Sequence, residues 1–145
     1  KKELLKKADY YLELLGIPHL KNKFPSNLSG GEKQKVSLIR TLILETEILL
    51  LDEPFSAIDY NTRLELQATI FKYAEKNNTT VILVTHDIDE AIAVSDRILI
   101  FGKKPKGVAF DIDINLNITD RSPVTARQHP LFAEYYKTIW ENYPR

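Results

Sequence analysis

Apolar residues recur at helical spacing in three segments of the first half of the chain. The first helix is expected before Gly16 and Pro18, the second from Ser29 to about Glu45, and the third over residues 61–76. The side chains expected to be buried on the second and third helices are Val36, Ile39, Leu42, Ile43, Leu64, Ala68, Phe71 and Ala74. Each helix therefore has one apolar stripe that needs a packing partner.

Two short apolar runs flank the third helix. Residues 48–51 and 81–84 contain no polar position, which is typical of strands buried on both faces of a parallel sheet. With the helix between them they predict a βαβ unit with a right-handed crossover. The fold class is therefore α/β.

The C-terminal part of the chain alternates between further helices and strands. A short helix over 88–94 precedes a strand over 97–101 and a turn over 102–105. Between 108 and 118 apolar and polar residues alternate, which predicts antiparallel or edge strands with one solvent-exposed face. A closing helix is expected after Pro130, with an aromatic and aliphatic stripe on one side.

Composition excludes several classes of protein. The 145 residues include 20 Lys+Arg and 20 Asp+Glu, so the basic excess of a nucleic-acid-binding protein is absent. Without cysteine there is no disulfide, thiolate zinc site or thiol nucleophile. No apolar run approaches the roughly 18 residues that span a bilayer, and no signal peptide is evident, so we expect a cytosolic location. Because the chain lacks Met, we expect it to be an excerpt of something longer.

Two acids, Asp52 and Glu53, follow the first apolar strand and precede Pro54. Their expected position is the carboxyl edge of a parallel sheet, where ligands bind in open α/β folds. One acid there can hold Mg²⁺ beside nucleotide phosphates, and its neighbour can orient or deprotonate a water. The alternative is that the acids cap the next helix or mark a loop. Two consecutive acids before a proline favour the functional interpretation.

A helix start and a histidine add two further candidates. Ser29 and Glu32 form a capping-box pattern, which alone is usually structural. Between them Gly30 and Gly31 leave bare amides at the positive end of a helix dipole, which suits a phosphate. His86 ends the second apolar strand and is expected at the same edge as the acids, although a lone histidine is more often a structural hydrogen-bonding residue.

Taken together, residues 28–32, 48–53, 56–59 and 86 resemble, in order and spacing, the ATP-binding-cassette (ABC) ATPase family. The resemblance implies an incomplete P-loop NTPase-like core: residues 1–28 belong to the helical subdomain, and 29–145 hold the signature helix and the C-terminal part of the core. The stretch after His86 is similar to the importer branch. The tail is similar to ATPases of nitrate, sulfonate, taurine and bicarbonate importers.

The resemblance also implies a mechanism, in which two cassettes sandwich two ATP molecules and drive a membrane permease. The implied site residues are Asp52 for Mg²⁺, Glu53 as general base, His86 at the γ-phosphate, Ser29, Gly30, Gly31 and Glu32 in the signature motif, and Asp59 in the D-loop. The signature motif acts on the nucleotide of the partner subunit. The implied partners are a second ATPase subunit, an integral membrane permease and, indirectly, a solute-binding protein, but no nucleic acid. The implied location is cytoplasmic and peripheral, on the inner face of the cell membrane.

Several departures from the family pattern are visible. Glu32 stands where the family commonly has Gln, Lys35 replaces Arg, and Ile58 replaces Leu. No G-x-x-x-x-G-K-[ST] motif occurs, because the only Gly-Lys pair, at 102–103, lacks the required earlier glycine. We therefore expect the C-terminal portion of a cassette, inactive alone. The alternatives are a non-catalytic interaction module and a soluble ABC ATPase of translation or repair, which the residues after His86 disfavour.

Overall fold

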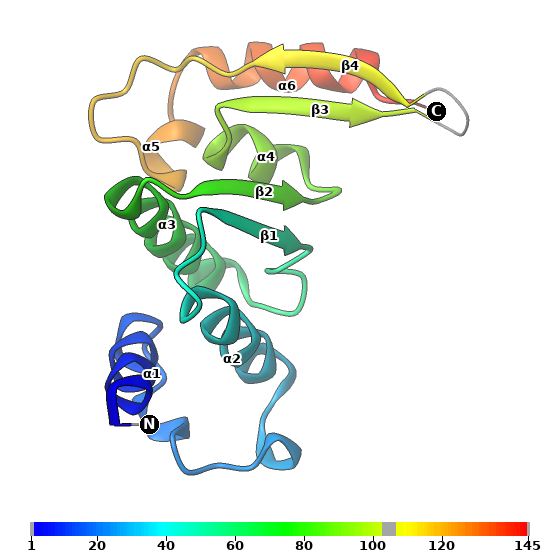
Figure 1. Ribbon diagram of the computed structural model, residues 1–145. Helices are drawn as coiled ribbons and strands as arrows, with labels where there is room; N and C mark the ends of the chain where they lie inside the picture. The colour runs from blue at the N-terminus through cyan, green and yellow to red at the C-terminus, as the bar shows by residue number, and fades with distance from the viewer. Residues whose placement is uncertain (1, 103–106, 145) are drawn as a thin grey trace. The chain divides into compact units, whose positions relative to one another are not determined.

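The computed structural model describes residues 2–102 and 107–144, which form two compact units (Figure 1). The first unit extends to Val84 and the second begins at Thr85. The first contains α1 (Lys2–Leu14), η1 (Pro18–Leu20), η2 (Pro25–Asn27), α2 (Gly30–Leu42), β1 (Ile48–Asp52), α3 (Tyr60–Asn77) and β2 (Thr80–Val84). The second contains α4 (Ile88–Val94), β3 (Arg97–Phe101), β4 (Val108–Asp113), α5 (Pro123–Arg127) and α6 (Leu131–Asn142).

The predicted βαβ unit is confirmed in the first unit. Strands β1 and β2 pair in parallel, with Leu50 opposite Ile82 and Asp52 opposite Val84. Helix α3 connects them, and its C-cap is Asn78, whose φ of 51° is a left-handed conformation that asparagine tolerates better than most residues. The carboxyl ends of the two strands therefore lie side by side.

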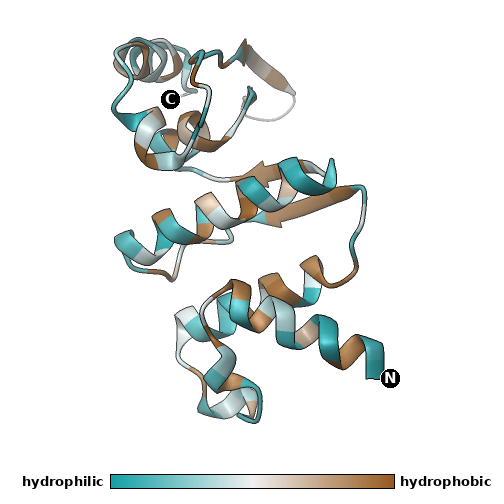
Figure 2. Cartoon of the chain, turned by 90° about the vertical axis from the view of Figure 1, so that its left-hand side faces the viewer, coloured by the Kyte–Doolittle hydropathy of each residue, from teal (hydrophilic) through white to brown (hydrophobic). Residues whose placement is uncertain are grey.

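The expectation that these strands are buried on both faces is wrong for the described chain. Leu49 and Leu51 are 2% and 6% exposed and belong to the core of the first unit, whereas Leu50 is 67% exposed. Ile82, opposite Leu50, is 49% exposed. Side chains of a strand alternate between faces, and the helices of this unit cover one face only. Figure 2 shows the paired strands as a hydrophobic ribbon beside α3.

Helix α3 packs through a different stripe from the one that its sequence suggested. Its buried apolar residues are Leu66, Ile70 and Tyr73, at spacings of four and three residues. Leu64 and Phe71, on the expected stripe, are only partly buried. The helix has apolar residues on two sides, so the pattern alone could not tell which side meets the core. Helix α2 was closer to expectation, with Ile39 and Leu42 buried.

In the second unit β3 and β4 pair antiparallel, as the alternating pattern predicted. The strand ends at Asp113, however, and the rest of the alternating segment has no strand. Its apolar residues Ile114 and Leu116 instead join the core of this unit, together with side chains of α4, α5 and α6. Helix α5 was not predicted, although Ser122 and Thr125 form a capping box at its start. Most of the expected turn at 102–105 lies outside the described residues.

Two organisational expectations concern the chain as a whole. The boundary expected after residue 28 lies inside the first unit and stays a prediction. Throughout the ranges 2–102 and 107–144, no helix has the length and apolar character needed to cross a membrane.

Candidate functional site

Ser29 is the N-cap of α2, and its capping box is fully formed. The Ser29 amide donates to the Glu32 carboxylate over 2.7 Å, and the Glu32 amide donates to the Ser29 hydroxyl oxygen over 3.3 Å. The amide hydrogen bond from Ser29 is the main reason that the pKa of Glu32 is lowered. The other carboxylate oxygen of Glu32 lies 3.8 Å from His19 Nε2 and 3.9 Å from Lys23 Nζ. The negative charge at this helix start is thus partly compensated.

Gly30 and Gly31 occupy the first two positions of α2, inside the capping box. The described chain provides no hydrogen-bond acceptor for their amides, whereas the amides on either side are satisfied. Neither glycine has a positive φ, and an added Cβ would come no closer than 4.0 Å to its surroundings at Gly30 and 3.4 Å at Gly31. Local packing and backbone conformation therefore do not require glycine here. Bare amides that an anion can approach closely are a sufficient reason for both residues.

The acid pair lies where the sequence placed it, at the carboxyl end of β1. Asp52 is the last residue of the strand, Glu53 follows it, and both side chains are exposed. Glu53 has a φ of 43°, a left-handed conformation that costs a residue with a side chain about 1–3 kcal/mol. A strained backbone of this kind persists only where the surrounding structure holds it firmly.

Hydrogen bonds hold the peptide groups of Glu53 on both sides. Its amide donates to the carbonyl of Val84 on β2 over 2.9 Å. Its carbonyl oxygen accepts from the Ser56 amide at 3.3 Å, from the Ser56 hydroxyl at 3.1 Å and from Gln34 Nε2 at 3.1 Å. The backbone that carries the candidate general base is therefore fixed by β2, by the following turn and by α2.

Gln34 is the residue that sequence reasoning missed. Besides the bond to Glu53, its amide group donates to the Ser56 hydroxyl over 3.2 Å and accepts from the Ala57 amide over 3.0 Å. Ala57 also lies beside the glycines, since its carbonyl oxygen is the nearest atom to a Cβ built on Gly31. No pattern in the sequence pairs residue 34 with residues 53–57, so only the fold could reveal this contact.

Asp59 has a local structural role. It is the N-cap of α3, and its carboxylate accepts from the Thr62 amide over 3.1 Å. This bond is the main cause of the lowered pKa of Asp59. Capping accounts for an acid at this position, and its expected role in passing information between sites stays a prediction.

His86 is exposed and belongs to the second unit, two residues beyond the end of β2. The next residue, Asp87, caps α4 by accepting from the Glu90 amide over 3.0 Å. The expected approach of His86 to Asp52 and Glu53 stays a prediction, because these residues belong to different units.

The donor set fits a magnesium ion that a nucleotide brings with it. Among residues 2–102 and 107–144 no three His, Asp or Glu side chains gather into a metal-binding group. Mg²⁺ is usually held by one or two carboxylates together with substrate phosphates and water, and not by a cage of protein ligands. The exposed carboxylate of Asp52 at the strand end suits that arrangement.

Comparison with known proteins assigns these features to a family. The family model described as "ABC transporter" matches residues 3–56, which include the acid pair and the start of α2 at residues 28–32, here called the signature turn. The chain is 41% identical to an uncharacterised ABC transporter ATP-binding protein, YtlC, of Bacillus subtilis over 87% of its own length and 48% of the relative's. It is 42% identical to an aliphatic sulfonates import ATP-binding protein of Pseudomonas syringae, with 80% and 51% covered. The chain belongs to the ABC transporter ATP-binding family.

Further relatives agree with this assignment. The nitrate transport protein NasD of Klebsiella oxytoca is 35% identical to this chain, over 94% of this chain and 54% of NasD. The dimeric structure of the cassette MJ0796 in a post-hydrolysis state with ADP and Pi matches with a TM-score of 0.69 and 31% identity, over 76% of this chain and 47% of the cassette. The chain thus spans about half the length of the relatives it matches, and its fold is that of part of an ABC ATPase cassette.

Proposed function

We propose that this chain is part of the ATP-hydrolysing subunit of an ABC importer, which couples ATP binding and hydrolysis in a cassette dimer to solute uptake through a membrane permease. One observation carries the proposal. Within the first unit, bare glycine amides at a helix start lie next to the turn that follows an exposed acid pair at a strand end. That combination supplies phosphate donors and a base from neighbouring parts of one compact unit.

Each group has a defined task in this mechanism. The amides of Gly30 and Gly31 donate to the terminal phosphates of the ATP held by the partner subunit. The Ser29 oxygen accepts from Glu32, which leaves its own proton to donate to the same phosphates. Glu53 polarises the attacking water at the nucleotide of its own subunit. Such fixed donors stabilise developing charge without reorganising during the reaction.

Three residues complete the proposed site. Asp52 would hold Mg²⁺, through water, and the ion would neutralise the charge of the phosphates. His86 contacts the γ-phosphate and responds to its loss. Asp59 passes information between the two sites of the dimer. Glu32 keeps the signature turn in shape through the capping box, since its carboxylate is already engaged with the Ser29 amide.

The names of two relatives support the proposed partners and solute. Proteins named for aliphatic sulfonate import and nitrate transport are 42% and 35% identical to this chain. We therefore propose an anion of the nitrate, sulfonate or taurine type as solute, with a second ATPase subunit in a homodimer, an integral permease and, indirectly, a solute-binding protein. The location is cytoplasmic, on the inner face of the membrane. No phosphate-loop motif occurs in the chain, so it works only together with a segment that supplies one.

The substitution Glu53→Gln in the intact subunit tests the proposal. Removing the base should lower ATP turnover by about 100-fold or more, while ATP binding persists and the dimer stays closed. ATPase assays and ATP-dependent dimerisation measured by size-exclusion chromatography check the two expectations. Unchanged turnover would remove Glu53 from the base role. Uptake of labelled nitrate or an alkanesulfonate by cells with and without the intact gene tests the solute.

A further inference from the structure

Gln34 connects two parts of the proposed site that act on different nucleotides. It lies on the first turns of α2, four residues after Gly30, and is half-buried. Its single amide group makes three hydrogen bonds, to the Glu53 carbonyl, the Ser56 hydroxyl and the Ala57 amide, all between 3.0 and 3.2 Å. Both the donor and the acceptor of the side chain are thus used on the segment 53–57.

The contact acts on a strained point of the backbone. Glu53 adopts a left-handed φ of 43°, which is uncommon for a residue with a side chain, and the backbone conformation at this residue helps to set the direction of its side chain. Two donors on this carbonyl come from Ser56, in the same turn, and the third comes from Gln34 on α2. Of these three donors, only the one from Gln34 ties the turn to the helix that begins with the signature glycines.

We propose that Gln34 is a positioning residue that fixes Glu53 relative to the signature turn of the same chain, and so couples the two ATP sites of the dimer. The inference rests on the proposed function, in which the signature turn serves the partner's nucleotide and Glu53 serves its own. A shift of α2 when Gly30 and Gly31 engage phosphate is transmitted through the amide of Gln34 to the backbone of Glu53. The link is short, since it consists of one side chain.

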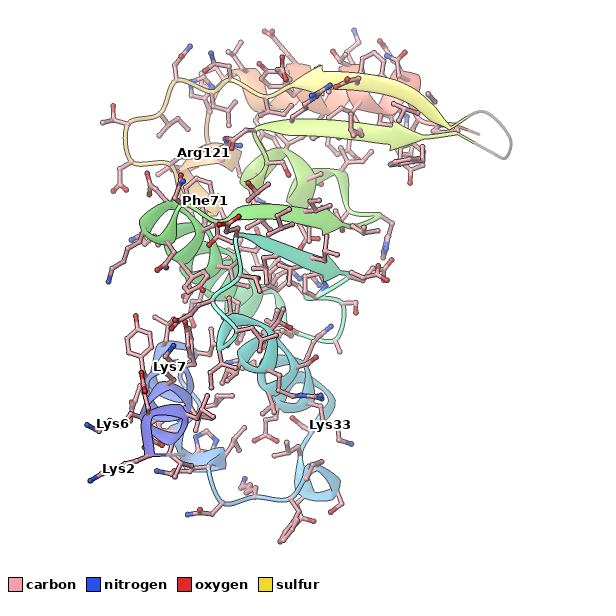
Figure 3. All side chains as sticks on the ribbon, in the orientation of Figure 1. Lys2, Lys6, Lys7, Lys33, Phe71 and Arg121 are labelled. Carbon is pink, nitrogen blue, oxygen red and sulfur yellow. The ribbon has the colours of Figure 1, made fainter. Side chains whose placement is uncertain are left out.

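Gln34→Met is the informative substitution in the intact subunit. Methionine has a similar length and helix propensity, so α2 and its packing are retained while all three hydrogen bonds are lost. The matched control is Lys33→Met, since Lys33 lies on the same turn of α2 with an exposed side chain that extends away from the helix (Figure 3). We expect Gln34→Met to lower kcat by about tenfold or more, because a small misplacement of a catalytic group has a large effect on rate. The KM for ATP should stay within about twofold in both variants, since uniform binding is untouched.

A mixed dimer separates the two ends of the link. One subunit carries Glu53→Gln, so only the ATP of the other subunit, called the live subunit, is hydrolysed. The signature turn that completes the site of the live subunit comes from the Glu53→Gln subunit. Gln34→Met is then added either to the live subunit or to the Glu53→Gln subunit, and single-turnover hydrolysis is measured. Coupling predicts a loss of about fivefold or more in both placements.

The outcomes discriminate clearly. A loss only in the live subunit would mean that Gln34 serves Glu53 alone, and a loss only in the Glu53→Gln subunit would mean that it serves the signature turn alone; either result overturns the coupling. If Gln34→Met does not fold, Gln34→Glu keeps an acceptor for the Ala57 amide but loses the donors to the Glu53 carbonyl and the Ser56 hydroxyl, and an unchanged kcat in that variant overturns the inference. Wild-type protein without ATPase activity would instead refute the proposed function.

Discussion

Gly31→Ala should make the protein more stable and less active. An alanine Cβ at this position would meet the Ala57 carbonyl oxygen at 3.4 Å, an ordinary van der Waals distance, and the φ is not in the left-handed region. The helix therefore accepts the methyl group, and the replaced glycine raises the free energy of unfolding by about 0.5–1 kcal/mol. The same methyl group obstructs the approach of a phosphate to the bare amide.

The functional loss follows from the hydrogen bonds at stake. A hydrogen bond to a charged group contributes about 1.5–3 kcal/mol, so weakening the amide contact should reduce ATP-driven dimerisation by about 10- to 150-fold. Dimerisation is measured in the Glu53→Gln background by analytical ultracentrifugation against ATP concentration, and stability by urea denaturation. Gly16→Ala is the control of opposite sign, because Gly16 has a φ of 68° that alanine tolerates poorly. That control should lose about 1 kcal/mol of stability with its ATP response intact.

Two results would refute this reasoning. Full ATP-driven dimerisation in Gly31→Ala would show that the amides do not contact phosphate. A loss of stability in Gly31→Ala comparable with that in Gly16→Ala would show that the glycine is needed for the fold, and the functional loss would then say nothing about a ligand.

Three further predictions concern acid, surface and core. Because the pKa of Glu32 is lowered on folding, its contribution to stability is complete above its ordinary pKa of 4.5 and is lost as pH falls through the lower pKa of the folded state. In Glu32→Gln the free energy of unfolding should therefore fall less steeply as the pH is lowered through this range. Replacing the exposed Leu50 and Ile82 by threonine should change stability by less than about 0.5 kcal/mol each, yet reduce self-association of the isolated chain in light scattering. Arg121→Met should lower the free energy of unfolding, measured by thermal denaturation, by about 2–4 kcal/mol, because the Arg121 side chain is 11% exposed and its guanidinium donates to one carboxylate and two backbone carbonyls. Arg97→Met is the control: the Arg97 side chain is 63% exposed in its ion pair, so the loss should be less than about 1 kcal/mol.

Local sequence signals predicted much of the fold. The bounds of α4 and β3 and the helix start at Ser29 followed directly from caps, glycines and apolar spacing. These features depend on neighbours in the chain, so a sequence records them. The parallel pairing of β1 and β2 followed from the order strand, helix, strand.

The missed features depend on partners that are distant in the chain. The apolar run through Leu50 indicated burial on both faces, but burial requires a covering element, and the described helices cover one face only. The choice between the two apolar sides of α3 likewise depends on where the core lies. The contact of Gln34 with residue 53 joins positions that are 19 residues apart, and the left-handed φ of Glu53 has no sequence signal, since glutamate rarely adopts it.

The left-handed backbone at Glu53 decides how an inactive form of the proposed ATPase should be made. Glutamine has the same stem and nearly the same backbone preferences, so Glu53→Gln changes the acid and leaves the loop alone. Valine or isoleucine at this position would be far more strained in the left-handed region, and the loop would relax into another path. Glycine would relieve the strain and loosen the turn. The effect of Glu53→Gln on turnover therefore reflects the loss of the acid alone. With valine, isoleucine or glycine at this position, the loss of the acid would be combined with a changed loop conformation.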